Sequence, residues 1–138
     1  MREGELVFVD SGAWIALALS RDPFHATAKA QWERLRGVGA KLRTSIPVVI
    51  ETYTFLDRNA NRDVAMTWKE SVYAPGVVAL LTCDERDLEE SWEYFRRRDL
   101  HRLSAVDATS FAIMKRERIR VAYTFDHHFA MVGFRLVA

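Results

Sequence analysis

The sequence has a single cysteine, Cys83, among its 138 residues, which excludes a disulfide framework and any zinc or iron–sulfur site built from several cysteines. It has no apolar run approaching about 18 residues, so we expect no membrane-spanning segment. Net charge is nearly absent as well. The 20 lysines and arginines are offset by 19 aspartates and glutamates, which excludes a strongly basic field for non-specific nucleic-acid binding. Residues 1–9 contain Glu3 and Glu5 and lack the cationic-then-apolar order of a signal peptide, so we expect a cytoplasmic protein.

The remaining composition is that of an ordinary folded protein. Hydrophobic residues make up 49% and charged residues 28% of the chain, a balance that argues against disorder. No internal repeat or low-complexity stretch is present. The length suits one domain that can bury a sizeable core, so we expect a single domain over residues 1–138.

Short apolar runs alternate with longer segments of helical spacing. Strands are predicted at residues 6–9, 41–43, 77–81, 120–125 and 134–137, those at 6–9 and 77–81 being fully buried. Helices are predicted at residues 24–35, 47–59, 62–72 and 126–132. Another is predicted after Asp84, with an inward stripe of Leu88, Trp92 and Phe95, and a further one after Ser104, with Phe111 and Met114 inward. Strands that alternate with helices indicate an α/β fold with a mainly parallel sheet.

Four of the 19 acidic residues lie in apolar surroundings, whereas the other fifteen lie in polar stretches typical of a solvated face, such as residues 84–87. The four are Asp10, Glu51, Asp107 and Asp126. A carboxylate in an apolar setting requires a cationic partner, hydrogen bonds, protonation or a metal ion. None of the four has a lysine or arginine beside it in the sequence, which favours a shared divalent cation.

The predicted topology brings these acids together. Asp10 and Asp126 follow two strands, and ligands of open α/β sheets bind beyond the carboxyl ends of strands. Glu51 lies about a turn and a half into its helix and Asp107 in the first turn of another, so both can point at the same crevice. Oxygen ligands suit Mg²⁺ or Mn²⁺, and two such ions about 4 Å apart are a recurrent solution for phosphodiester cleavage.

Each acid also has a structural interpretation, which the sequence leaves open. Asp10 and Asp126 can cap the helices that follow them. The segment from Ser104 to Asp107 matches a capping box. Glu51 can pair with a buried arginine. It is the joint occurrence of the four that favours the metal site.

The four acids lie in motifs that resemble those of the PIN-domain ribonucleases, and most of all the VapC-type toxins of bacterial toxin–antitoxin pairs. The matching segments are Phe8-Val9-Asp10-Ser11-Gly12-Ala13-Trp14, Ile50-Glu51, Leu103-Ser104-Ala105-Val106-Asp107-Ala108 and Thr124-Phe125-Asp126-His127-His128-Phe129. Their order and spacing extend over nearly the whole chain. Gly12 departs from the family pattern, which often has Ser or Asn there.

The resemblance implies a three-layer α/β/α fold with a five-stranded parallel sheet in the order 3-2-1-4-5. It implies Mg²⁺- or Mn²⁺-dependent hydrolysis of RNA that leaves 5′-phosphate and 3′-hydroxyl ends. On this basis Asp10, Glu51, Asp107 and Asp126 are the catalytic and metal-binding residues, and Thr124 and Ser11 support them. The resemblance also implies a homodimer and a cognate antitoxin, which would lie across the active-site groove and reach the metal site with an arginine or an acidic tail.

Rival functions fit the motifs less well. A phosphoryl-accepting receiver domain would need a pair of acids after the first strand and a lysine after the last, and neither is present. A phosphatase with an Asp-x-Asp nucleophile is disfavoured because residue 12 is glycine. A catalytically inactive PIN-like scaffold that only binds a partner is the remaining alternative, and the complete set of four acids argues against it.

Several other residues have an ordinary structural interpretation. Cys83 is expected to be a small buried hydrophobic residue rather than a nucleophile. His127 and His128 are expected to be surface or hydrogen-bonded residues, with a metal or substrate role as the alternative. Trp32, Trp68 and Trp92 are expected in the core or an interface rather than as base-stacking platforms. The run Arg96–Arg98 is interpreted either as a solvated helix end or as a contact to RNA phosphates.

Overall fold

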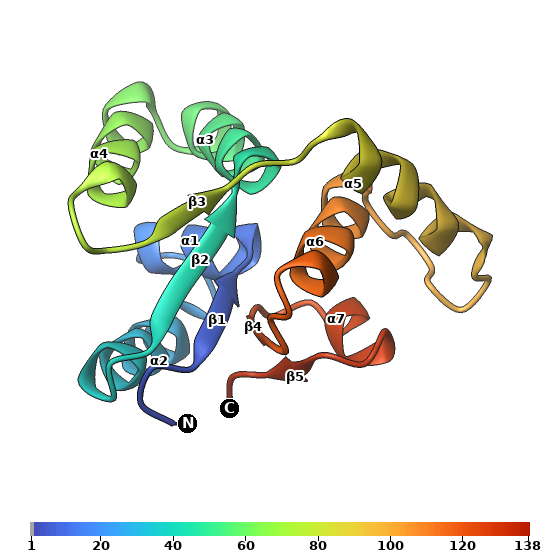
Figure 1. The fold of residues 1–138 in the computed structure, drawn as a ribbon. Helices are drawn as coiled ribbons and strands as arrows, with labels where there is room; N and C mark the ends of the chain where they lie inside the picture. Colours follow the sequence, from blue (N-terminus) through green and yellow to red (C-terminus); the bar gives the residue numbers. More distant parts are fainter. Residues whose placement is uncertain (1) are drawn as a thin grey trace.

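The computed structural model describes residues 2–138 and contains a five-stranded sheet in which every neighbouring pair of strands is parallel. The strand order is β3-β2-β1-β4-β5, which confirms the predicted order (Figure 1). The strands are β1 (Leu6–Val9), β2 (Lys41–Ser45), β3 (Ala79–Leu81), β4 (Val121–Tyr123) and β5 (Arg135–Leu136). Because the order reverses at β1, strands from the two ends of the chain lie beside each other in the middle of the sheet.

Helices connect the strands and flank the sheet (Figure 1). They are α1 (Ser11–Ala18), α2 (His25–Gly37), α3 (Ile46–Asn59), α4 (Arg62–Tyr73), α5 (Glu85–Ser91), the 3₁₀ helix η1 (Trp92–Arg96), α6 (Ala105–Arg116) and α7 (His128–Met131). In the described part of the chain, no helix combines the length and apolar character that a membrane crossing requires.

Side-chain caps define where the central helices begin, as the sequence predicts. The Val48 N–H donates to Ser45 Oγ at 3.3 Å at the start of α3, and Pro47 occupies the first turn, where its missing N–H costs nothing. The Asp107 N–H donates to Ser104 Oγ at 3.0 Å at the start of α6. These caps fix the first turns of the two helices that carry Glu51 and Asp107.

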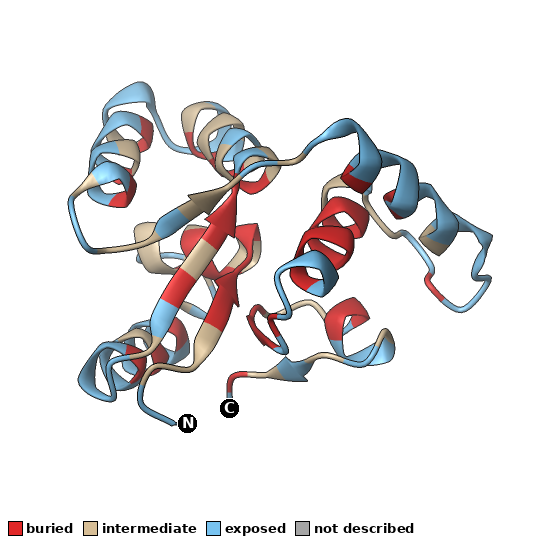
Figure 2. Cartoon of the chain, viewed as in Figure 1, coloured by how far each residue is buried: buried red, intermediate tan, exposed pale blue. Residues whose placement is uncertain are grey.

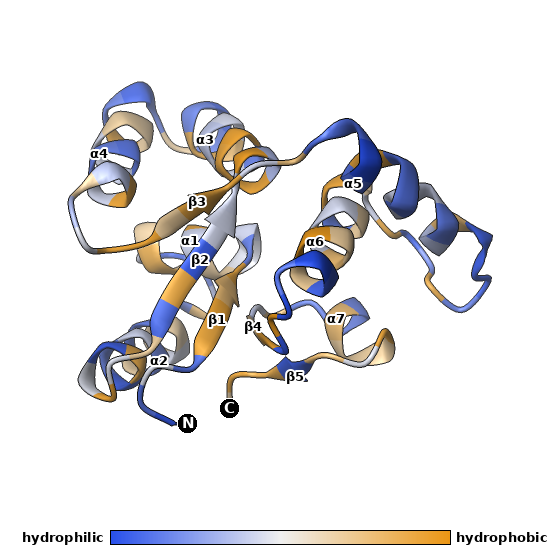
Figure 3. Ribbon diagram, in the orientation of Figure 1, coloured by the Kyte–Doolittle hydropathy of each residue, from blue (hydrophilic) through white to orange (hydrophobic). Residues whose placement is uncertain are grey.

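The core lies around β1 and α6, which are buried along most of their length (Figure 2). Val7, Phe8 and Val9 are fully buried, and so are Phe111 and Met114, as predicted. The hydropathy of the chain follows the same division: β1 is hydrophobic throughout, whereas α5 is mostly hydrophilic (Figure 3). The strand that precedes Asp10 is therefore held rigidly by packing on both of its faces.

Two predictions about buried segments are wrong. The strand predicted at residues 77–81 is shorter and is not fully buried, because β3 lies at the edge of the sheet with Ala79 exposed. The predicted inward stripe of Leu88, Trp92 and Phe95 is exposed, with exposed fractions of 40%, 50% and 45%. The helix changes to 3₁₀ geometry at Trp92, and α5 instead buries its Asp87 and Ser91 face.

Asp87 is the buried acid that the sequence did not reveal, because most of its neighbours are charged. It completes a capping box with Asp84 and forms an ion pair with Arg116 of α6. Arg116 also donates to the Thr82 carbonyl at 3.1 Å. This pair ties α5 to α6, so Asp87 has a structural role.

Candidate active site

Two of the predicted acids are brought together by the pairing of β1 with β4. The Asp10 N–H donates to the Tyr123 carbonyl at 3.0 Å, which continues the ladder between the two strands by one residue. Asp10 therefore leaves the end of β1 beside Thr124, which lies 114 positions away in the chain. Asp126 follows two residues later on the same segment.

Thr124 connects these two acids. Its hydroxyl donates to Asp10 Oδ2 at 2.8 Å and accepts the Asp126 N–H at 3.0 Å. Asp10 is only 3% exposed, and its other oxygen, Oδ1, is buried without a hydrogen-bond partner. A buried carboxylate oxygen with no donor is costly, so this atom is available to a cation.

Glu51 reaches the same region from α3. It is half-buried, and its Oε1 accepts a hydrogen bond of 2.6 Å from the Ser11 hydroxyl at the start of α1. No arginine or lysine is paired with it among the described residues 2–138, so the alternative of a buried arginine partner is wrong. Ser11 thus orients the carboxylate of Glu51, in line with the supporting role that the family resemblance implies for it.

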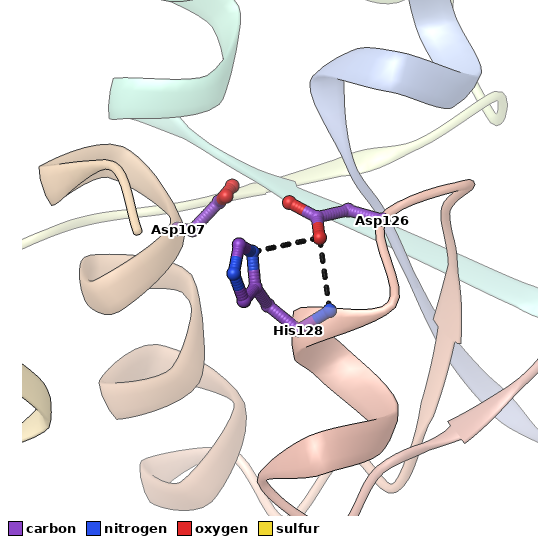
Figure 4. Close-up of side chains that lie close together, drawn as sticks. All are labelled: Asp107, Asp126 and His128. Carbon is purple, nitrogen blue, oxygen red and sulfur yellow. Dashed lines mark hydrogen bonds and ion pairs between the residues drawn. The ribbon is translucent and has the colours of Figure 1, made fainter. Parts of the chain in front are cut away.

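Asp107, Asp126 and His128 form the tightest group of potential ligands (Figure 4). One candidate ligand atom from each lies within 4.8 Å of the others. Asp107 projects from the first turn of α6 towards Asp126, which precedes α7. The sequence predicted both aspartates in the site but treated His128 as a surface or hydrogen-bonded residue.

His128 is buried and holds Asp126 in place. Its Nδ1 lies 2.8 Å from Asp126 Oδ1, and its backbone N–H donates to the same oxygen at 2.9 Å. Its Nε2 lies 2.7 Å from the His101 carbonyl oxygen, which can only accept. His128 thus contacts Asp126 through both its backbone N–H and its ring, and these contacts make it a positioning residue for Asp126.

All four predicted acids line one cavity of about 530 Å³. Its wall also includes Asp22, His127, two serines and several apolar side chains, but neither lysine nor arginine is present in the described lining. The carboxylates of Asp10, Glu51 and Asp107 make no ion pair with any described basic residue. The negative charge of the cavity is therefore not neutralised by the protein's own arginines and lysines.

The acid–base properties of the cluster reflect this concentration of charge. Burial raises the pKa of Asp10 to about 6. The hydrogen bond from Thr124 and the nearby backbone N–H of Ser11 oppose this rise, and the charges of Glu51 and Asp126 add to it. Burial raises the pKa of Asp107 to about 9, reinforced by the charge of Asp10 and by its hydrogen bond to Asp126. For Asp126 burial alone would raise the pKa, but hydrogen bonds from Asp107 and His128 outweigh it, so the pKa is lowered.

Capping explains these acids only in part. Asp10 occupies the N-cap position of α1, yet its side chain makes no capping hydrogen bond. The capping box predicted at Ser104 is half formed, because Ser104 accepts the Asp107 N–H while the Asp107 carboxyl turns towards Asp126. Asp126 alone makes a local bond, accepting the His128 N–H.

These donors fit a hard divalent cation. The group offers carboxylate oxygens from four segments of the chain, an unpartnered buried oxygen on Asp10, and a proton on Asp107 that a cation would displace. Mg²⁺ and Mn²⁺ both prefer such oxygen ligands. The metal-binding and catalytic roles of the four acids remain a prediction.

The other residues singled out in the sequence lie away from this cavity. Cys83 is half-buried, and burial, together with Asp87 and Asp84, raises the pKa of its thiol, which is unfavourable for a nucleophile. Trp68 is buried as expected, whereas Trp92 is half exposed. The run Arg96–Arg98 is exposed at the end of η1, as expected for a solvated helix end.

A separate apolar groove of about 670 Å³ lies between α1, α2 and α4. Trp14, Trp32 and Trp68 line it, with Trp14 in contact with both others at ring distances of 5.7 and 5.9 Å. Asp63 is the one acidic residue in the described lining. This groove has no set of groups for chemistry, so the acidic cavity is the candidate active site.

Comparison with known proteins agrees with this geometry. The family model described as "PIN domain" matches residues 7–135. The 23S rRNA-specific endonuclease VapC20 of Mycobacterium tuberculosis is 37% identical over 130 residues, which cover 94% of this chain and 95% of VapC20. The same sequence match is found in two strains of that organism.

Solved structures show the same fold. The crystal structure of M. tuberculosis VapC20, described as a Sarcin-Ricin loop cleaving toxin, superposes with a TM-score of 0.83 at 34% identity, over 93% of this chain and 95% of that one. VapBC2 from Rickettsia felis, bound to a DNA fragment from its promoter, gives a TM-score of 0.72 over 95% of this chain and 96% of the other, but at 9% identity it shows the fold alone. On the family match and the similarity to VapC20, this chain belongs to the PIN-domain family.

Proposed function

We propose that the protein is a metal-dependent endoribonuclease and the toxin of a type II toxin–antitoxin pair, acting in the cytoplasm. The observation that carries the proposal is the cavity lined by Asp10, Glu51, Asp107 and Asp126. Its described lining has no lysine or arginine, and it contains a buried carboxylate oxygen without a hydrogen-bond partner. The match to VapC20 over nearly the full length of both chains supports the choice of RNA as substrate.

The four acids are proposed to hold Mg²⁺ or Mn²⁺. The ion, when bound, lowers the pKa of a water and stabilises the oxygen that leaves the phosphorus. Asp10 and Asp126 supply oxygens from the strand ends, where Thr124 fixes their relative position. Glu51 and Asp107 supply oxygens from two helices, and Ser11 orients Glu51. The resemblance to the PIN-domain ribonucleases implies that this hydrolysis leaves 5′-phosphate and 3′-hydroxyl ends.

The partners of the protein are proposed from its relatives. VapC20 is named for its specificity for 23S rRNA, so large ribosomal RNA and a hairpin with the sarcin–ricin sequence are the first substrates to test. A cognate antitoxin is proposed as the inhibitory partner, because the chain is similar to VapC toxins over nearly its full length. A homodimer is expected on the same ground.

RNA cleavage by the wild type and by Asp10→Asn and Asp126→Asn tests the activity. We expect cleavage in Mg²⁺ or Mn²⁺, none in excess EDTA, and a loss of at least about 100-fold in kcat for each variant, because each removes an oxygen and a charge from the ion. Asp63→Asn is the matched control, since this exposed aspartate lies outside the acidic cavity and its variant should cleave normally.

Far-ultraviolet circular dichroism and melting would confirm that all three variants are folded. Normal cleavage by Asp10→Asn and Asp126→Asn, or cleavage that persists in EDTA, would refute the assigned chemistry. A folded wild type that binds no divalent cation and cuts no RNA would instead support the alternative of a catalytically inactive PIN-like scaffold.

A further inference from the structure

Two phenylalanines stack at the wall of the acidic cavity. Phe24 lies immediately before α2, and Phe125 lies between Thr124 and Asp126. Their ring centroids are 4.5 Å apart and their planes differ by 9°, so the rings are nearly parallel. Both line the cavity that contains the four acids.

The stack is held in place by its surroundings. The Phe24 N–H donates to Asp22 Oδ1 at 2.8 Å, and the His25 N–H donates to the Asp22 carbonyl at 3.0 Å, which fixes the turn that carries Phe24. Phe125 packs edge-on against Tyr123, a fully buried ring of β4, at 6.5 Å. The pair is therefore ordered before any ligand binds.

The fold does not use all of this aromatic surface. Phe24 is 49% exposed although its ring is stacked on Phe125. The stack therefore leaves a large part of this residue open to solvent. A flat, fixed and half-exposed aromatic ring beside an acidic cavity is a surface on which a planar ligand can stack.

The charges of the cavity favour a nucleobase as that ligand. The ionised acids of the cavity, Asp22 among them, repel the phosphates of RNA except where a cation intervenes, and the described lining contributes no lysine or arginine to attract them. Stacking does not depend on charge, and it is the usual way in which proteins hold the unpaired bases of single-stranded RNA. An aromatic platform therefore supplies an attraction to RNA that does not depend on the charge of the cavity.

We propose that Phe24, supported from behind by Phe125, stacks on an unpaired nucleobase next to the phosphodiester bond that is cut. This inference rests on the proposed function, because it assigns the base-binding part of the same site. Phe24 is then a substrate-positioning residue that tightens RNA binding, while the four acids carry the chemistry.

Substitutions at Phe24 test this role. Phe24→Ala is expected to raise KM about 5- to 150-fold, the effect that loss of an aromatic–base stack produces, with little change in kcat. Phe24→Leu, which keeps apolar bulk but has no flat ring, should behave like the alanine variant, and Phe24→Trp should restore the wild-type KM. The matched control is Phe95→Ala, since this residue is similarly exposed, at 45%, but lies on η1 outside the cavity.

A direct readout of stacking does not depend on cleavage. The cut site is first mapped, and 2-aminopurine is then placed on either side of it in an RNA hairpin. With EDTA present, binding to the wild type and to Phe24→Trp should quench this base and give equal dissociation constants by anisotropy. Phe24→Ala and Phe24→Leu should bind about 5- to 150-fold more weakly, with the quench lost at saturation. If the wild type cuts no RNA, the known sarcin–ricin hairpin is scanned with the probe at each loop position.

The outcomes separate the two proposals. Equal KM, affinity and quenching in the wild type and Phe24→Ala would overturn the stacking role while leaving the nuclease intact. A leucine variant that restores binding as well as tryptophan would also overturn it, because the contact would then be apolar packing alone. Quenching that depends on Phe24 in a protein without cleavage would support the stack and refute the proposed function.

Discussion

Replacement of Asp107 by asparagine should make the metal-free protein more stable at neutral pH. Burial and neighbouring acids raise the pKa of this carboxyl from its usual 3.8 to about 9 in the folded chain. The folded state therefore retains a proton that the unfolded chain releases. The stabilisation from this proton is complete below pH 3.8 and is lost progressively as the pH rises to about 9.

The size of the effect follows from the same shift. Each pKa unit corresponds to about 1.4 kcal/mol, so between pH 4 and pH 7 the wild type would lose at most about 4 kcal/mol through this one group. Relaxation of the cavity and entry of water reduce this, and we expect a difference of about 2 kcal/mol. Asparagine does not ionise, and its amide can donate to Asp126 as the protonated carboxyl does.

Urea unfolding in EDTA across pH 4 to 8 would measure this difference. We expect the free energy of unfolding of Asp107→Asn to exceed that of the wild type by about 2 kcal/mol at pH 7.5 and to equal it at pH 4. Its melting temperature should be higher by about 6–8 °C at the upper pH. Asp99→Asn is the control, because Arg97 lowers the pKa of this exposed carboxyl and its removal should give a slight loss instead.

Addition of Mn²⁺ should make the wild type the more stable of the two proteins. Binding of the ion stabilises the folded wild type, whereas the variant has lost a ligand oxygen. The reasoning would be refuted if Asp107→Asn were less stable than the wild type in EDTA at pH 7.5. It would equally be refuted by a gain of the same size at pH 4.

Two further substitutions probe the supports of the site and of the fold. Thr124→Val removes the hydroxyl that joins Asp10 to the Asp126 N–H, so we expect metal affinity or kcat to fall about 10- to 100-fold. Thr124→Ser keeps the hydroxyl and should remain close to the wild type. An unchanged Mn²⁺ affinity of Thr124→Val in a titration would contradict this. Arg116→Met leaves Asp87 buried without its cation and should lower the free energy of unfolding, measured in urea, by about 3 kcal/mol. The metal affinity of the folded protein should stay the same. A loss of stability below about 1 kcal/mol would show that the pair is not structural.

Much of the fold could be predicted because local signals agree with the tertiary structure. The apolar run Leu6–Val9 is a central strand, and Ser45 and Ser104 are caps where the sequence places them. The prediction that Leu88, Trp92 and Phe95 point inward is wrong, because a change to 3₁₀ geometry at Trp92 breaks the helical spacing that joins them. Such a change depends on how the segment packs, and its sequence carries no signal for it.

The candidate site could be assembled from the sequence for a similar reason. Its four acids stand out because their neighbours are apolar, and the structure places all four on one cavity. Asp87 shows the limit of this signal, since a buried acid among charged neighbours looks solvated. The contact of His128 with Asp126 and the stack of Phe24 on Phe125 arise between segments whose relative placement only the folded chain defines.

The reversal of strand order at β1 has a consequence for how the protein is made. The hydrogen bond between Thr124 and Asp10 joins residues that lie 114 positions apart in the chain. A chain still emerging from the ribosome has no complete set of acids until residue 126 has been added and has folded back against residue 10. If the four acids act together as proposed, a polypeptide that stops before residue 126 cannot cut RNA, and activity begins only after this segment has folded into place.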